Sequence, residues 1–119
     1  MNNKFILAWM DDWQMSARLA KFSTSNSYEL IFCENGLQVP VDASVQSVLI
    51  IDIGGLEEEE FKQIPQLQED ASFFIIAYDR EMDGARIKYF RDLGCDMVLR
   101  RNKLLKNLDT LLQKIINAD

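Results

Sequence analysis

The chain has 119 residues, of which 48% are hydrophobic and 27% are charged, and this composition is typical of one globular domain spanning residues 1–119. Its formal net charge of −6 argues against nucleic acid or an anionic membrane as the partner, because both favour clustered Lys and Arg, so we expect protein partners or cations. The chain contains no histidine, which excludes the usual serine and cysteine triads, histidine-ligated zinc and a phosphohistidine donor.

The first third of the chain predicts a strand, a helix and a second strand. The apolar run at residues 4–10 predicts the first strand. The run is too short to span a bilayer, and two acids follow it where a signal peptide would have a cleavage site of small residues. We therefore expect a cytoplasmic protein. Residues 11–22 predict a helix with apolar residues on one face. The polar cluster "STSNS" at residues 23–27 predicts the end of that helix, and residues 28–33 predict the second strand.

The middle of the chain contains the strand with the clearest chemical signal. Residues 37–46 predict only a weak helix or a loop, because a proline interrupts them. The stretch "SVLIIDIGG" at residues 47–55 is typical of a strand buried on both faces, with Asp52 at its carboxyl end. Residues 56–64 predict a helix with four solvated acids in its first turn, and Pro65 is expected to end or bend it.

The last part of the chain continues the alternation of strands and helices. Residues 72–78 and 96–99 predict strands, residues 82–93 predict a helix that ends at Gly94, and residues 104–116 predict a final amphipathic helix. Five strands that alternate with helices in so short a chain indicate an α/β fold, with a parallel sheet covered by helices on both faces.

The final helix carries more apolar residues than one stripe requires. The stripe that we expect in the core is Leu104, Leu108, Leu111 and Ile115. The neighbouring residues that widen it, and that offer a dimer or partner surface, are Leu105, Leu112 and Ile116.

Acidic residues follow two of the predicted strands. Asp11 and Asp12 come after the first strand, where either can cap the following helix, and Asp52 ends the third. The carboxyl ends of parallel strands lie along one edge of the sheet, so the three carboxylates are expected to approach one another. Such a cluster takes up protons, captures a hard cation such as Mg²⁺, or is bridged by a basic side chain, for which Arg100 and Arg101 are available.

The acid pair after the first strand, the single Asp52 after the third and the stretch "GCDMVLRR" at residues 94–101 resemble a response-regulator receiver domain of two-component signalling over nearly the whole chain. The resemblance implies a flavodoxin-like, doubly wound (βα)5 fold with strand order 2-1-3-4-5, and a receiver-like domain without an output domain. It also implies that Asp11 and Asp12 bind Mg²⁺ together with Asp52 and the backbone carbonyl of Gly54.

The same resemblance gives Asp52 the role of phosphoacceptor, with a partner histidine kinase as the phosphoryl source. A carboxylate attacks a phosphorus centre only where the approaching negative charges are offset. No enzymatic activity is expected beyond self-phosphorylation of Asp52 from a phosphodonor and its hydrolysis.

The sequence departs from the family pattern at its switch positions. The family's Ser or Thr at the end of strand four is Ala77, which has no hydroxyl, and the next position holds Tyr78, which either covers the site or offers its phenol. The family's lysine is Arg101 and the proline after it is Asn102. Arginine favours bidentate hydrogen bonding to a carboxylate, so Arg101 could pair with Asp52. Two alternatives follow: Asp52 accepts a phosphoryl group, or it pairs with Arg101. The aromatic switch position is Val98.

Two tryptophans flank the acid pair. Trp9 is expected in the core, whereas Trp13 is expected in a partly exposed loop, as a lid over the pocket or a partner contact. Cys33 and Cys95 lack the CxxC spacing of redox or zinc sites and are predicted to be buried hydrophobes.

The sequence therefore favours a stand-alone receiver-like signalling domain that acts through protein–protein interaction, with the fourth helix, fifth strand and fifth helix as the contact face for a partner or a homodimer. The alternative is a phosphorylation-independent pseudo-receiver that serves only for docking. A small flavodoxin-like cofactor-binding protein is disfavoured, because no glycine-rich phosphate loop follows the first strand.

Overall fold

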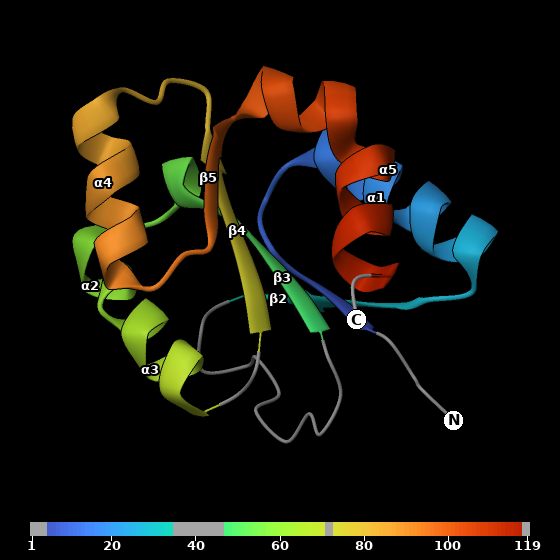
Figure 1. Ribbon diagram of the computed structural model, residues 1–119, viewed down its shortest axis with the longest axis horizontal. Coiled ribbons are helices and arrows are strands. Elements are labelled where there is room, and N and C mark those ends of the chain that lie inside the picture. Colours follow the sequence, from blue (N-terminus) through green and yellow to red (C-terminus); the bar gives the residue numbers. More distant parts are fainter. Residues whose placement is uncertain (1–4, 35–46, 71–72, 118–119) are drawn as a thin grey trace.

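The structure is a computed structural model that describes residues 5–34, 47–70 and 73–117, so the segment 37–46 lies outside the described residues. Its centre is a five-stranded parallel sheet in the order β2-β1-β3-β4-β5, which confirms the predicted order. The strands, shown in Figure 1, are β1 (Phe5–Trp9), β2 (Glu29–Cys33), β3 (Ser47–Asp52), β4 (Phe73–Asp79) and β5 (Met97–Arg100).

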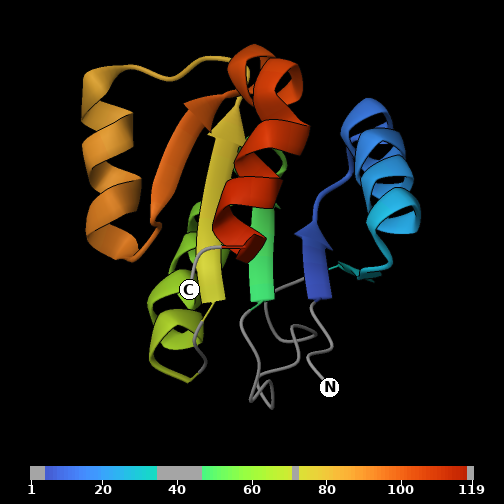
Figure 2. The same cartoon turned by 45° about the vertical axis from the view of Figure 1, so that its right-hand side comes forward.

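Helices cover both faces of the sheet, as Figures 1 and 2 show from two directions. One face carries α1 (Trp13–Asn26) and α5 (Arg101–Asn117). The other carries α2 (Glu58–Phe61), α3 (Gln63–Asp70) and α4 (Gly84–Leu93), and a short 3-10 turn, η2 (Ile53–Gly55), leads from β3 toward them. This arrangement is the doubly wound α/β fold predicted from the sequence.

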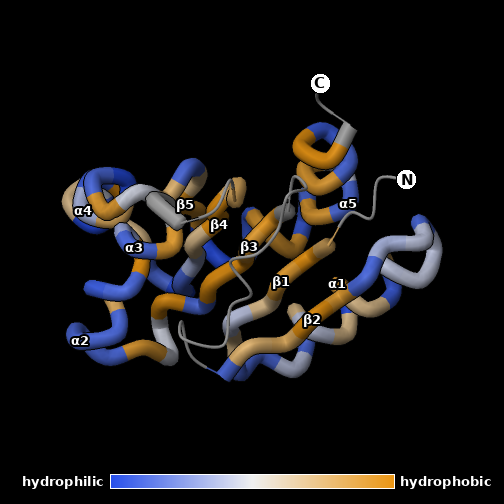
Figure 3. Tube along the Cα trace, turned by 90° about the horizontal axis from the view of Figure 1, so that it is seen from below, coloured by the Kyte–Doolittle hydropathy of each residue, from blue (hydrophilic) through white to orange (hydrophobic). Residues whose placement is uncertain are grey.

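The alternation of side chains along the strands builds two separate cores. On β3, Leu49 and Ile51 point into the cluster under α2, α3 and α4, whereas Val48 and Ile50 point into the cluster under α1 and α5. All four are at most 2% exposed, as expected for a strand buried on both faces. Figure 3 agrees with this, since it shows mostly hydrophobic residues along the central strands and a mixture of hydrophobic and hydrophilic residues along helices such as α5.

The first helix is longer than predicted. The polar cluster at 23–27 was expected to end the helix, but α1 continues to Asn26. The helix continues because Ser23 is buried beside Phe22 and the Asn26 side chain donates a hydrogen bond to the Phe22 carbonyl. Ser27 then ends it in a left-handed conformation, with a φ of 60°.

The predicted helix over 56–64 is divided into two. Helix α2 ends at Phe61 and α3 begins at Gln63, so the break precedes Pro65. Pro65 lies in the first turn of α3, where backbone N–H groups form no intrahelical hydrogen bond, so the proline removes none. The acids of the α2 first turn stabilise its start, and the Glu57 N–H donates to the Glu60 carboxylate.

The final helix begins three residues earlier than predicted, at Arg101, and its buried face is wider than the predicted stripe. Leu111 and Ile115, two members of that stripe, are only partly buried. The residues expected to form a dimer surface lie instead in the core, at most 9% exposed: Leu105, Leu112 and Ile116. Within the described residues, no helix is long and apolar enough to cross a membrane.

One hydrogen bond at the start of β5 supports a prediction on stability. The Asp96 carboxylate accepts a bond of 2.8 Å from the backbone N–H of Ile75, a residue with no exposed surface. Asp96→Ala leaves that buried donor unpaired, so we expect a loss of about 1–2 kcal/mol in the free energy of unfolding, measured with urea. Asp92→Ala is the control, because its ion pair with Lys88 is exposed and should change stability by a few tenths of a kcal/mol at most.

Candidate functional site

The carboxyl ends of the strands border a pocket of about 530 Å³. The structure places around it five residues singled out from the sequence: Asp11, Asp12, Asp52, Gly54 and Arg101. They come from the loop after β1, the end of β3, the turn η2 and the first residue of α5. The fold thus brings together acids that lie 40 positions apart in the chain, because parallel strands end at the same edge.

Asp12 accepts four hydrogen bonds. It is the N-cap of α1, and its Oδ1 accepts from the Met15 N–H at 3.1 Å and from Arg101 Nη2 at 3.0 Å. Its Oδ2 accepts from Arg101 Nε at 2.8 Å and from the Tyr78 hydroxyl at 3.0 Å. A carboxylate has about four acceptor positions, so this arrangement, which we call the Asp12 network, uses all of them.

The Asp12 network also fixes protonation states. The hydrogen bonds from Arg101 lower the pKa of Asp12 to about 2, so Asp12 is ionised at neutral pH. Burial, followed by the negative charges of Asp52 and Asp12, raises the pKa of Tyr78 far above its usual value, so the phenol stays a donor. Tyr78 has no exposed surface, so it offers its phenol to Asp12 from within the core beneath the pocket.

Arg101 pairs with Asp12, and the predicted pairing with Asp52 is wrong. Arg101 is the first residue of α5, and its Nη2 also donates to Gln14 Oε1 at 3.0 Å, in the first turn of α1. The guanidinium therefore bridges the starts of two helices that lie on the same face of the sheet. A bidentate, partly buried pair of this kind holds the arginine in one orientation.

Asp52 forms no salt bridge within the described part of the chain. Its Oδ1 accepts from the Gly54 N–H at 3.1 Å, which caps the turn η2. Burial raises the pKa of Asp52, and the charges of Asp12 and Asp79 raise it further, whereas the Gly54 N–H and Arg101 oppose the shift. Asp52 is thus the pocket acid whose ionisation the surroundings disfavour.

Asp79 is a pocket residue that sequence reasoning missed. It ends β4, so the rule that located Asp52 at the end of β3 could have found it. Its carboxylate accepts from Arg86 of α4 and from the Arg80 N–H, each at 2.7 Å. A Cβ at Gly54 would lie 2.5 Å from Asp79 Oδ1, so a larger residue there would displace the Asp79 carboxylate from its present position.

The remaining predicted residues divide between core and rim. Ala77 is fully buried in the core under α2, α3 and α4 and is not among the pocket-lining residues. Trp9 is buried as predicted, whereas Trp13 is 89% exposed at the pocket rim. Cys33 and Cys95 are buried, as predicted.

The arrangement does not fit Mg²⁺. The divalent site implied by the resemblance needs oxygen ligands with free lone pairs, and Asp12 has none left. Asp11 is exposed, and the described residues contain no group of three or more acids or cysteines placed to hold a metal ion. Arg101 already supplies the positive charge beside Asp12 that a metal would bring.

Comparison with known proteins gives matches only at the level of structure. No family model matches the chain, and no curated protein sequence matches it. A two-component response regulator from Clostridium difficile is similar in structure, with a TM-score of 0.77 at 11% identity and 98% of each chain covered.

Two Burkholderia pseudomallei proteins are also similar. One is a response regulator with a phosphorylated aspartic acid, a calcium ion and citrate, with a TM-score of 0.74 at 14% identity, covering 98% of this chain and 68% of that one. The other is named as related to pilus assembly, with a TM-score of 0.73 at 18% identity, covering 96% and 89%. At these identities the likeness establishes the fold, and the chain has the flavodoxin-like fold of response-regulator receiver domains.

Proposed function

We propose that the chain is a receiver-like signalling module that works by docking to a protein partner and that needs neither Mg²⁺ nor phosphorylation of Asp52 for this. The partner would contact the surface formed by α4, β5 and α5. The fold it shares with response-regulator receivers supports a role in signalling. The proposal that docking needs neither Mg²⁺ nor phosphorylation rests on the arrangement of Asp12 and Asp52 in the pocket.

The observation that carries the proposal is the saturated carboxylate of Asp12. In the implied receiver chemistry, paired acids hold a cation that offsets the charge of an incoming phosphoryl group. Here Arg101 and Tyr78 occupy both oxygens of Asp12, and Arg80, the second arginine among the described residues that line the pocket, is exposed.

The surroundings of Asp52 support the same reading. Asp12 and Asp79 place negative charge beside it, which opposes the approach of an anionic phosphodonor. Ala77 offers no hydroxyl to a phosphoryl group. Asp52 would then act as a structural residue that caps the turn η2.

The direct test is to incubate the chain with Mg²⁺ and acetyl phosphate, and separately with Mg²⁺ and beryllofluoride, beside an Asp52→Asn control. We expect no added phosphoryl group by intact-mass spectrometry and no change in Trp13 fluorescence, because Arg101 is held by Asp12 and the charges of Asp12 and Asp79 beside Asp52 oppose an anionic phosphodonor. A mass gain that disappears in Asp52→Asn would contradict the proposal and make Asp52 a phosphoacceptor.

Removing the arginine tests whether the Asp12 network is what prevents metal binding. Arg101→Ala frees two acceptor positions on Asp12, so we expect Mg²⁺ to alter Trp13 fluorescence at millimolar concentration in this variant and not in the wild type. Arg80→Ala is the matched control, since it removes one positive charge from the same pocket and leaves Asp12 untouched. Equal metal affinity in both variants would show that pocket charge, and not the Asp12 network, controls binding.

The lowered pKa of Asp12 predicts how its contribution to stability depends on pH. Its pKa is about 2 in the folded chain and 3.8 in the unfolded reference, so the stabilisation is complete above about pH 4 and is lost as the pH falls through 2. Asp12→Asn should therefore lower the free energy of unfolding by about 2 kcal/mol at pH 7 and by almost nothing near pH 2. Urea unfolding at both pH values measures this, with Asp11→Asn as an exposed control. A pH-independent loss would argue against the ion pair as its cause.

A further inference from the structure

A second pocket lies at the carboxyl edge of the sheet, where the ends of β1 and β2 approach η2 and α2. Its volume is about 420 Å³, which is within the range typical of small-molecule sites. It shares Asp11, Asp52 and Gly55 with the pocket described above, but its remaining walls come from β1, β2 and the segment that leads into α2. We call it the β2 pocket.

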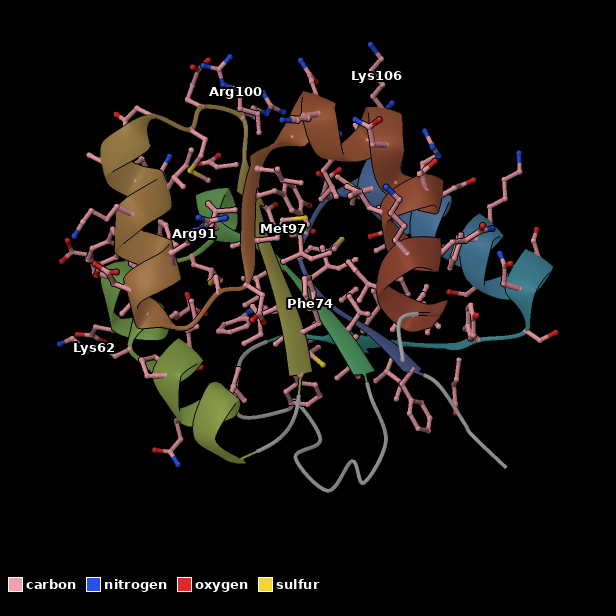
Figure 4. All side chains as sticks on the ribbon, viewed as in Figure 1. Lys62, Phe74, Arg91, Met97, Arg100 and Lys106 are labelled. Atoms are coloured by element: carbon pink, nitrogen blue, oxygen red, sulfur yellow. The ribbon has the colours of Figure 1, made fainter. Side chains whose placement is uncertain are left out.

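The charge of the β2 pocket has one sign. The described residues that line it include four acids and no Lys or Arg; the acids are Asp11, Glu34, Asp52 and Glu60. Figure 4 shows Arg91 on α4 and Arg100 at the end of β5, which is the opposite end of the sheet from β2. A cleft lined by charges of one sign concentrates ions of the other sign, so the β2 pocket favours a cation.

The apolar walls of the β2 pocket favour an organic cation over a metal ion. Phe32 of the edge strand β2 is 54% exposed, and Met10 and Leu56 are only partly buried. A ligand with an apolar body would cover these side chains, whereas a bare ion would not. The acids of the pocket are also not placed together as metal ligands, because the described residues contain no group of three or more acids or cysteines that could hold a metal ion.

The indole of Trp9 adds a requirement for a hydrogen-bond acceptor. Trp9 lines the β2 pocket and is only 2% exposed, and its Nε1 is buried without a hydrogen-bond partner among the described residues. An indole N–H can only donate, and a buried donor without an acceptor costs free energy. The acids around the pocket would repel an anionic acceptor, so a neutral oxygen such as an amide carbonyl suits this donor best.

We propose that the β2 pocket binds a small organic cation that also carries a neutral oxygen acceptor, as an acylated amine does. The ammonium group would lie toward Asp11 and Glu60, the carbon chain against Phe32, and the oxygen would accept a hydrogen bond from Trp9 Nε1. Binding includes a small rearrangement of the pocket wall, because Nε1 itself has almost no exposed surface. The inference is independent of docking through α4, β5 and α5.

N-acetylputrescine is the test ligand, because a short carbon chain joins its ammonium group to an amide carbonyl. The reporter is the indole N–H signal of Trp9 in a ¹⁵N-labelled sample, which the variant Trp13→Phe distinguishes from the second tryptophan. We expect saturable binding with a Kd of roughly 0.1–1 mM and a downfield shift of the Trp9 indole proton, since a new hydrogen bond deshields it.

Two analogues of similar length separate the two parts of the ligand. N-pentylacetamide keeps the carbonyl and lacks the charge, whereas n-heptylamine keeps the charge and lacks the carbonyl. We expect each analogue to bind at least about fivefold more weakly than N-acetylputrescine, and n-heptylamine to leave the indole proton without a downfield shift.

Two matched variants locate the cation. Glu60→Gln removes one negative charge from the β2 pocket and keeps an acceptor for the Glu57 N–H, so we expect N-acetylputrescine to bind about threefold to fivefold more weakly. Glu58→Gln is the control, because Glu58 lies in the same first turn of α2, is exposed and does not line the pocket. Its affinity should stay within about 1.5-fold of the wild type.

Trp9→Phe tests the acceptor separately. This variant keeps an aromatic ring and removes the N–H, so N-acetylputrescine should lose its advantage over n-heptylamine. Urea unfolding confirms that the variants are folded, and the analogue series in the wild type keeps the inference testable if Trp9→Phe is not.

Three results would overturn the inference. One is an indole signal of Trp9 that does not move with N-acetylputrescine at concentrations up to roughly 10 mM. The others are N-pentylacetamide that binds as tightly as N-acetylputrescine, and equal weakening by Glu60→Gln and Glu58→Gln.

Discussion

The site depends on one carboxylate whose hydrogen-bonding capacity is fully used. Asp12 caps α1, receives the phenol of Tyr78 from β4 and holds the guanidinium of Arg101 at the start of α5. A single side chain therefore links three elements at the carboxyl edge of the sheet. Leaving any of these donors unpaired in a partly buried setting is costly, so the partners hold one another in place.

The same contact determines what the pocket can do. A cation at this edge would have to displace Arg101 to reach the carboxylate of Asp12, and Arg101 is also anchored on Gln14. Asp52 is left in a negative environment that disfavours its ionisation, which is the reverse of what an anionic reaction partner requires. Under the proposed function, the chain would share the fold of receiver domains without the electrostatic conditions for metal-assisted phosphoryl transfer.

The sequence predicted the sheet well because its strands are short apolar runs between helices, a pattern that allows few parallel topologies. It also predicted that Asp11, Asp12 and Asp52 lie at one edge, since this follows from strand direction alone. It could not assign the partner of Arg101, because Asp12 and Asp52 lie along the same edge and only the three-dimensional position of the α5 start decides between them.

The predicted helix boundaries were wrong where packing in three dimensions overrides the local sequence pattern. The polar residues after Phe22 favour a turn locally, but the buried contacts of α1 extend the helix to Asn26. The apolar residues of α5 could not be divided between core and surface by spacing, because the helix lies across several strands and buries a broad face that includes Leu105 and Ile116.

Helix α5 begins at Arg101, so a residue that lines the acidic pocket also fixes one end of a helix that belongs to the proposed contact face. Under the proposed function, a contact face anchored in this way would need no chemical modification to set its geometry. The amount of partner captured would then follow the number of copies of the chain present, which moves control from modification of the protein to its synthesis and turnover.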